Sequence, residues 1–151
     1  MFKQKNNNTE YIVNDQNHVV KGIDRGDTAA FLGIRYARGE RFKKPVLEPL
    51  AAEVTATKYG DGCPQLRQFF DESKSKSKTD MLYYTEFRKG LSFTYSEDCL
   101  NLNIFVPKNA ENLPVLLYIH GGAFVICSSD ERPFDGKEIA KEGVICVTAN
   151  Y

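Results

Sequence analysis

The alternation of hydrophobic and polar positions divides the chain into short strands separated by polar turns. Residues 115–119, Val-Leu-Leu-Tyr-Ile, are apolar without alternation, which is typical of a strand buried on both faces. Residues 144–148 repeat this pattern, whereas residues 100–107 alternate and predict a strand with one buried face. Residues 136–143 predict a short helix closed by a glycine. Strand, helix and strand in this order predict a parallel crossover, and hence an α/β fold.

The first half of the chain has weaker patterns. Residues 11–13 and 18–23 predict two short strands joined by an Asx-rich turn, and residues 28–37 predict a strand or an irregular buried segment. Residues 1–10 are polar and are expected to form a disordered tail. Residues 63–99 are polar and irregular, but aromatic residues gather in their second half. We interpret this stretch as a lid-like loop that either covers a cavity or packs on the core.

The apolar strand at 115–119 stops at His120 and is followed by Gly121, Gly122 and Ala123. Small residues at the carboxyl end of a sheet strand let backbone N–H groups approach a bound atom. Fixed N–H groups of this kind can hold the negative oxygen that develops when an ester or amide carbonyl is attacked. The motif is therefore a candidate half of an oxyanion hole, and the alternative is an ordinary tight turn.

Two residue types that often act in catalysis need separate interpretation. His120 is either a catalytic base or a residue whose ring supports the loop, and we favour support because no nucleophile motif accompanies it. A Ser-x-x-Lys pattern also occurs within the Ser-Lys repeat at residues 73–78. Because this repeat is strongly polar, we interpret it as a solvated surface segment.

Composition narrows the class of protein further. The 151 residues carry 20 Lys and Arg against 20 Asp and Glu, so nothing predicts a nucleic-acid partner or an anionic membrane surface. No apolar run reaches the length of a membrane span, and no secretory leader is recognised, so we expect a soluble, cytoplasmic protein. The four Cys form no C-x-x-C pair, and we predict neither a metal nor an organic cofactor.

Several blocks together resemble the type-B carboxylesterases, the cholinesterase and carboxylesterase branch of the α/β-hydrolase fold. The most specific block is Ser-Glu-Asp-Cys-Leu at 96–100. The blocks follow the family's order at residues 31–37, 41–45, 59–65, 96–103 and 113–124, and residues 144–151 resemble a sixth. The resemblance implies an N-terminal, incomplete part of one α/β-hydrolase domain over residues 1–151. Small antiparallel strands would lead into a mixed, mostly parallel sheet.

The resemblance also assigns roles to the loop. It implies that the backbone N–H groups of Gly122 and Ala123 donate to the substrate carbonyl oxygen and that Gly121 shapes the turn. Phe124 would line an apolar approach for the substrate, a small-molecule ester.

Other positions that match the family have structural roles. Arg41 and Glu97 match a buried ion pair. Cys63 and Cys99 match a pair that closes a loop in secreted relatives, and whether this bridge forms here stays open.

The remaining catalytic parts are expected elsewhere. No Gly-x-Ser-x-Gly occurs in these residues, and the resemblance implies that the nucleophile, the acid and the base all lie beyond them, so the chain alone is predicted to be inactive. In the family the strand at 115–119 has a neighbour on each side, so the remainder of the domain is needed to cover a bare sheet edge. Two alternatives stay open: a non-catalytic, cholinesterase-like binding or adhesion domain, and an unrelated α/β anion-binding domain.

Overall fold

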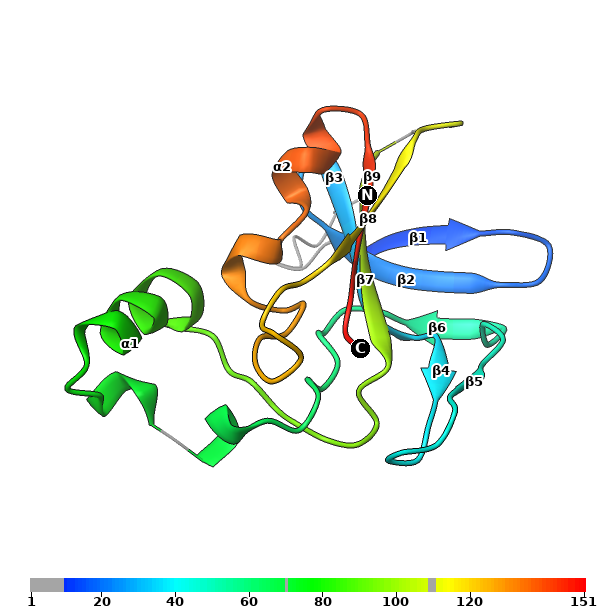
Figure 1. Ribbon diagram of the computed structural model, residues 1–151. Coiled ribbons are helices and arrows are strands. Elements are labelled where there is room, and N and C mark those ends of the chain that lie inside the picture. Colours follow the sequence, from blue (N-terminus) through cyan, green and yellow to red (C-terminus); the bar gives the residue numbers. More distant parts are fainter. Residues whose placement is uncertain (1–9, 70, 109–110) are drawn as a thin grey trace.

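A computed structural model describes residues 10–69, 71–108 and 111–151, and these form a mixed sheet with helices beside it (Figure 1). The described part contains a seven-stranded sheet in which six strands run in the order β1-β2-β3-β7-β9-β8, while β6 pairs with β2. Its strands are β1 (Glu10–Asn14), β2 (Val19–Asp24), β3 (Thr28–Arg35), β6 (Glu53–Thr55), β7 (Asn101–Pro107), β8 (Val115–Ile119) and β9 (Ile145–Ala149). A separate two-stranded ribbon joins β4 (Ala37–Arg38) to β5 (Val46–Leu47).

The predicted strands are found, with ends shifted by a residue or two. The turn between β1 and β2 is held by Asp15, whose carboxylate accepts the backbone N–H groups of Asn17 and His18, each at 2.7 Å. This is the Asx turn that the sequence predicts. Residues 1–9 of the expected tail lie outside the described residues, and Glu10 already belongs to β1.

The predicted crossover between parallel strands is confirmed, because β8 pairs with β9 in parallel. The short helix α2 (Lys137–Lys141) lies between them along the chain and ends before Gly143, which has a φ of 83°. A left-handed glycine after the last turn is a common helix stop. Most other pairings in the described sheet are antiparallel, so this part of the domain departs from the mostly parallel sheet that we expected.

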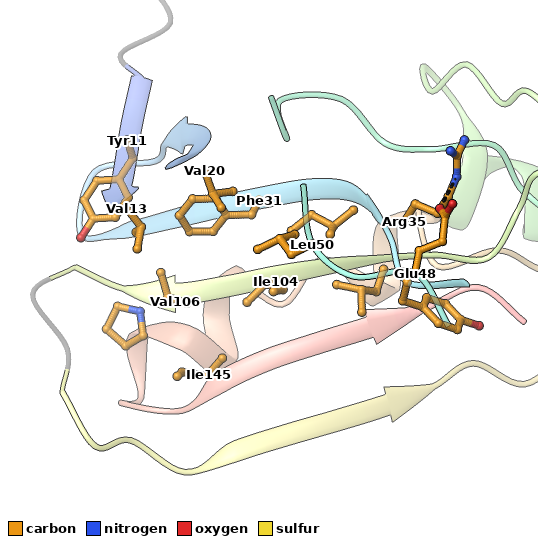
Figure 2. Close-up of a pocket in the computed structure, with 14 residues that line it drawn as sticks. Tyr11, Val13, Val20, Phe31, Arg35, Glu48, Leu50, Ile104, Val106 and Ile145 are labelled. Carbon is orange, nitrogen blue, oxygen red and sulfur yellow. Dashed lines mark ion pairs between the residues drawn. The ribbon is translucent and has the colours of Figure 1, made fainter. Parts of the chain in front are cut away.

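The two faces of the sheet are unequally covered. On one face, Phe105 of β7 packs with Ala140 of α2 and with Cys146 of β9, and all three are buried. The neighbouring side chains of β7 point to the other face, where they border a cavity of about 530 Å³ (Figure 2). The lining residues are mainly apolar and come from five strands, among them Tyr11, Val20, Phe31, Ile104 and Ile145. Within the described residues, no helix packs over this second face.

Strand β8 corrects one prediction. Its five side chains were expected to be buried on both faces, but they are 40–65% exposed. The reason is topological: β8 is the last strand in the order, and within the described residues it pairs only with β9. An apolar run identifies a strand suited to the middle of a sheet, but the side chains are buried only if other elements of the chain lie beside and over that strand.

The segment at residues 63–99 contains more regular structure than the sequence predicts. It includes η1 (Leu66–Phe69), η2 (Glu72–Lys74), α1 (Lys78–Tyr83) and a π-helical turn, η3 (Tyr84–Arg88). Ser77 caps α1 by accepting the N–H of Asp80 on its hydroxyl oxygen. A further 3-10 turn, η4 (Arg132–Phe134), precedes α2.

This segment is attached to the rest of the molecule through buried polar contacts. The guanidinium of Arg88 pairs with Glu131 at 2.9 Å and with Glu72 at 3.0 Å. The hydroxyl of Tyr83 donates to the same Glu131 carboxylate. These contacts hold α1 and η3 against the chain that follows the Gly121–Gly122 loop.

Candidate functional site

The candidate loop begins where β8 ends, at the carboxyl edge of the parallel β8–β9 pair. The last paired residues are Ile119 and Ala149, so His120 and Asn150 both lie just beyond the ladder. In α/β sheets this edge is where ligands usually bind. The loop therefore lies where the sequence predicts a site.

Three successive peptide groups of this loop are held by hydrogen bonds to their carbonyl oxygens. The His120 carbonyl accepts the hydroxyl of Tyr151 at 2.8 Å, and the Gly121 carbonyl accepts Nδ1 of the His120 ring at 2.8 Å. The Gly122 carbonyl accepts the N–H groups of Val125 and Ile126 at 3.0 and 3.1 Å. Because a trans peptide is planar, its N–H points away from its own carbonyl oxygen. Each of these bonds therefore also fixes the direction of the next N–H.

The N–H groups so directed are those of Gly121, Gly122 and Ala123. Across residues 10–69, 71–108 and 111–151, none of the three donates a hydrogen bond to the protein. Gly121 and Ala123 are exposed, and Gly122 is half-buried. Exposed N–H groups with fixed directions are free to bind an acceptor from solution.

The backbone of the loop is unusual at Gly122 rather than at Gly121. Gly122 has a φ of 121°, and Ala123 and Phe124 follow in the left-handed region at 53° and 61°. A Cβ atom on Gly122 would overlap the carbonyl of Ile126, whereas one on Gly121 would meet nothing within 4 Å. The position that requires glycine in this loop is therefore Gly122, the residue after the one to which the resemblance assigns the shape of the turn.

His120 is buried between two aromatic rings and contacts its own loop. Its ring stacks on Tyr151 at 4.6 Å and on Phe134 at 6.0 Å between centroids. Because Nδ1 contacts a carbonyl oxygen, we assign the ring proton to that nitrogen. Within the described residues no carboxylate contacts the ring, so the third group of a catalytic triad is not found beside it.

Phe124 extends outward from the loop and is 90% exposed. Its edge meets the ring of Tyr151 at 5.9 Å. A small hollow of about 40 Å³ beneath it is lined by Gln65, His120, Phe124, Cys127 and Tyr151, among others. Phe124 is thus an exposed ring with a shallow hollow at its base, and its role as an approach surface for a substrate stays a prediction.

The other residues that the resemblance singles out lie away from the loop or at its border. Arg41 and Glu97 form the expected ion pair, but the two side chains are 57% and 56% exposed, so the pair is not buried in this chain. Cys63 and Cys99 are free thiols that interact with each other. This interaction raises the pKa of the Cys63 thiol, with burial as a second cause, and lowers the pKa of Cys99.

Asn150 holds together three segments that the sequence did not connect. Its side-chain oxygen accepts the backbone N–H of Ser129 at 2.7 Å, and its amide donates to the carbonyl of Asp61 at 3.3 Å. Its backbone carbonyl accepts the hydroxyl of Tyr36 at 2.8 Å. Sequence reasoning missed this role because the partners are distant along the chain.

Asn103 is the centre of a second buried polar group, inside the sheet. Its amide nitrogen donates to the hydroxyls of Ser129 and Thr148, both at 3.1 Å. Its oxygen accepts the N–H of Gly33 at 3.0 Å. The carbonyl of Ser129 lies at 3.5 Å from the same nitrogen, so the amide N–H groups and the amide oxygen all have partners, which come from three segments of the chain.

Next to the loop lies a buried carboxyl group. Asp130 is 8% exposed, and its Oδ1 accepts no hydrogen bond from the described residues. Burial raises the pKa of this carboxyl above its ordinary value, and it does the same for the neighbouring Glu131.

The described residues contain neither a metal-binding cluster nor a membrane-spanning helix. Among residues 10–69, 71–108 and 111–151, no cluster of three His, Cys, Asp or Glu side chains is placed to bind a metal ion. In the same residues, no helix is long and apolar enough to cross a membrane.

The mixed sheet, the parallel β8–β9 pair and the glycine loop at its carboxyl edge define part of an α/β-hydrolase domain. Residues 10–151 match the model of the carboxylesterase family, and the chain belongs to that family. This membership excludes the alternative of an unrelated anion-binding domain.

Several characterised relatives have similar sequences and structures. The chain is 38% identical over 150 residues to the para-nitrobenzyl esterase of Bacillus subtilis, a match that covers 95% of the chain and 28% of that protein. It is 34% identical over 139 residues to gut esterase 1 of Caenorhabditis elegans, covering 87% and 22% of the two proteins. A solved PNB esterase structure matches 95% of the chain and 28% of its own length, with 37% identity and a TM-score of 0.70. The chain thus spans roughly a quarter of the length of these relatives.

Proposed function

We propose that this chain is the amino-terminal part of a serine carboxylic ester hydrolase and supplies its oxyanion hole. The observation that carries the proposal is the set of unpaired N–H groups at Gly122 and Ala123, each fixed through the carbonyl of its own peptide. Donors held in place before the reaction stabilise developing charge without reorganising. The relationship to named esterases supports the same reaction class.

In the proposed reaction a serine from the remainder of the domain attacks the ester carbonyl. As the bond from serine oxygen to carbon forms, the carbonyl oxygen becomes negative and accepts the N–H groups of Gly122 and Ala123. The catalytic base, which takes the serine proton during the attack, gives it to the departing alcohol. Water then loses a proton to the same base, attacks the acyl-enzyme and releases the acid, and the proton returns to the serine. Phe124 would contact the apolar part of a small-molecule ester.

The proposal implies that the chain has no esterase activity by itself. The nucleophile, the acid and the base are all expected in the remainder of the domain, and oxyanion donors alone do not provide the covalent route. Purified chain should therefore release no p-nitrophenol from p-nitrophenyl acetate above the buffer rate. Turnover that a Gly122→Pro change abolishes would contradict this expectation.

A fusion protein tests the oxyanion assignment directly. We define it as this chain joined to the part of the Bacillus subtilis para-nitrobenzyl esterase that lies outside the matched region. Replacing Ala123 by lactic acid exchanges its N–H for an ester oxygen and keeps the side chain. Removal of one oxyanion donor is expected to lower kcat by about 100- to 1000-fold.

The matched control for this experiment is Gly90. It also has a positive φ, at 81°, and its N–H donates to no described residue. Replacing Gly90 by glycolic acid should leave kcat unchanged. Equal activity of the Ala123 and Gly90 derivatives would refute the assignment. A residue other than serine at the nucleophile position downstream of this chain would instead favour a non-catalytic binding domain.

A further inference from the structure

Tyr151 contacts the loop on both sides of the donor segment. Its hydroxyl donates to the carbonyl of His120, and its ring stacks on the His120 ring with 24° between the planes. The same ring meets the edge of Phe124 at 5.9 Å with an interplanar angle of 75°. His120 and Phe124, which flank the segment 121–123, thus both contact the side chain of Tyr151.

The hydroxyl of Tyr151 replaces a hydrogen bond of the parallel ladder. At the start of the β8–β9 pair, the N–H of Ile145 donates to the carbonyl of Pro114 at 2.9 Å. Repeated regularly, this pattern would bring the N–H of Tyr151 to the carbonyl of His120. The side chain makes that bond instead, at the point where the loop turns away from the sheet.

The hydrogen bond from the Tyr151 hydroxyl fixes the orientation of the first of the three successive peptide groups, the one between His120 and Gly121. With the His120 carbonyl fixed, the imidazole stays over the next peptide and its Nδ1 reaches the carbonyl of Gly121 at 2.8 Å. That carbonyl belongs to the same planar group as the N–H of Gly122. A change at the Tyr151 hydroxyl is therefore transmitted to the direction of a donor.

We propose that Tyr151 is a positioning residue for the oxyanion hole, acting through the His120 carbonyl and the His120 ring. This inference rests on the proposed function. It predicts that the hydroxyl of Tyr151 affects the stabilisation of the transition state more than the binding of the ground-state ester.

Tyr36 provides a matched control for Tyr151, because its hydroxyl binds the residue next to Tyr151, Asn150. Its hydroxyl donates to the backbone carbonyl of Asn150 at 2.8 Å, so it makes the same kind of bond with the same length. Among the described residues, the Tyr36 hydroxyl makes no hydrogen bond to the loop at residues 120–124. Loss of the Tyr36 hydroxyl should therefore cost comparable stability without changing the donors.

The experiment compares Tyr151→Phe and Tyr36→Phe in the fusion protein. Tyr151→Phe keeps the ring contacts and should lower kcat about five- to tenfold, the range expected for one lost hydrogen bond, with KM unchanged within about twofold. A trifluoromethyl ketone forms a hemiketal with the serine and places its oxyanion in the hole. Its inhibition constant should rise by the same factor as kcat falls.

The outcomes separate this proposal from the proposed function. Equal effects of the two variants on kcat, or a change in KM alone, would overturn the role of Tyr151. If the folded fusion hydrolyses no ester, the proposed function fails, and crystal structures of the fusion with and without Tyr151→Phe then decide the positioning role. A displaced loop at residues 120–124 would support it, and an unmoved loop would overturn it.

Discussion

Arg88 and Glu131 form an ion pair in the interior, with 2.9 Å between Nη1 and Oε1 and side chains that are 7% and 1% exposed. The pair joins the helical segment after residue 63 to the turn that follows the candidate oxyanion loop. Its burial distinguishes it from the Arg41–Glu97 pair, which the resemblance identifies as buried and which is exposed in this structure.

Removing one member of the buried pair should be far more costly than removing one member of the exposed pair. Arg88→Met leaves the buried carboxylate of Glu131 without its ion-pair partner, and we expect the free energy of unfolding to fall by about 3–5 kcal/mol. Arg41→Met should cost less than about 1 kcal/mol. Urea unfolding of the fusion protein measures both, and similar losses for the two variants would contradict the difference in burial.

Replacing Gly122 by alanine should destabilise the protein for two reasons: the positive φ of this residue and the overlap of the added Cβ atom with neighbouring backbone. Gly90 also has a positive φ, but a Cβ there meets nothing within 4 Å, whereas one at Gly122 overlaps the Ile126 carbonyl. We expect Gly90→Ala to cost about 1 kcal/mol and Gly122→Ala about 3 kcal/mol or more. Thermal unfolding of the two fusion variants tests this, and equal costs would mean that the loop relaxes freely.

The buried carboxyl of Asp130 should make a contribution to stability that falls as the pH rises. Burial raises its pKa in the folded state, so above the ordinary value of 3.8 the folded protein holds a proton that the unfolded chain has lost. The contribution of Asp130 to stability is therefore greatest below pH 3.8 and decreases until the pH passes the raised pKa. Asp130→Asn removes this dependence.

The measurement is the difference in urea midpoint between the fusion protein and its Asp130→Asn variant from pH 3.5 upward. The variant should gain relative to the parent as the pH rises above 3.8. A difference that is constant with pH would show that the carboxyl is not penalised by burial. Glu131, whose pKa is raised too, contributes to both proteins equally.

The exposed edge strand β8 should make the chain self-associate. Its five apolar side chains are 40–65% exposed, and unpaired strand edges of this kind recruit other strands. Purified chain should elute as aggregates in size-exclusion chromatography, and Leu117→Lys, at a position that is 60% exposed, should reduce them. A monodisperse monomer with a sharp thermal transition would contradict the prediction.

The sequence predicted those parts of the fold that depend on local pattern. Apolar runs located β8 and β9, the Asx residues located the first turn, and Gly143 marked the end of α2. The position of the glycine loop followed because a strand end and a run of small residues are adjacent in the chain.

The features that the sequence did not predict depend on contacts between distant residues or on short polar helices. The hydroxyl of Tyr151 and the amide of Asn150 act across more than twenty residues, and no periodicity reports such bonds. Helix α1 is six residues long and has no buried residue, so it lacks the apolar stripe that identifies a helix. The bare edge of β8 was expected from the resemblance, but the exposure of its side chains depends on what covers them, which hydropathy does not encode.

The amide of Asn103 specifies how the central strands align. Neighbouring positions on β7, Leu102 and Ile104, face the apolar cavity, so a slip of one residue against β9 would turn the amide toward hydrocarbon. Its partners Ser129 and Thr148 would be left behind, and burying an unpaired amide costs about 1–3 kcal/mol on protein scales. The hydrogen bonds of this single side chain thus favour one register of the two strands over the adjacent registers. Hydrophobic packing alone would distinguish these registers less sharply.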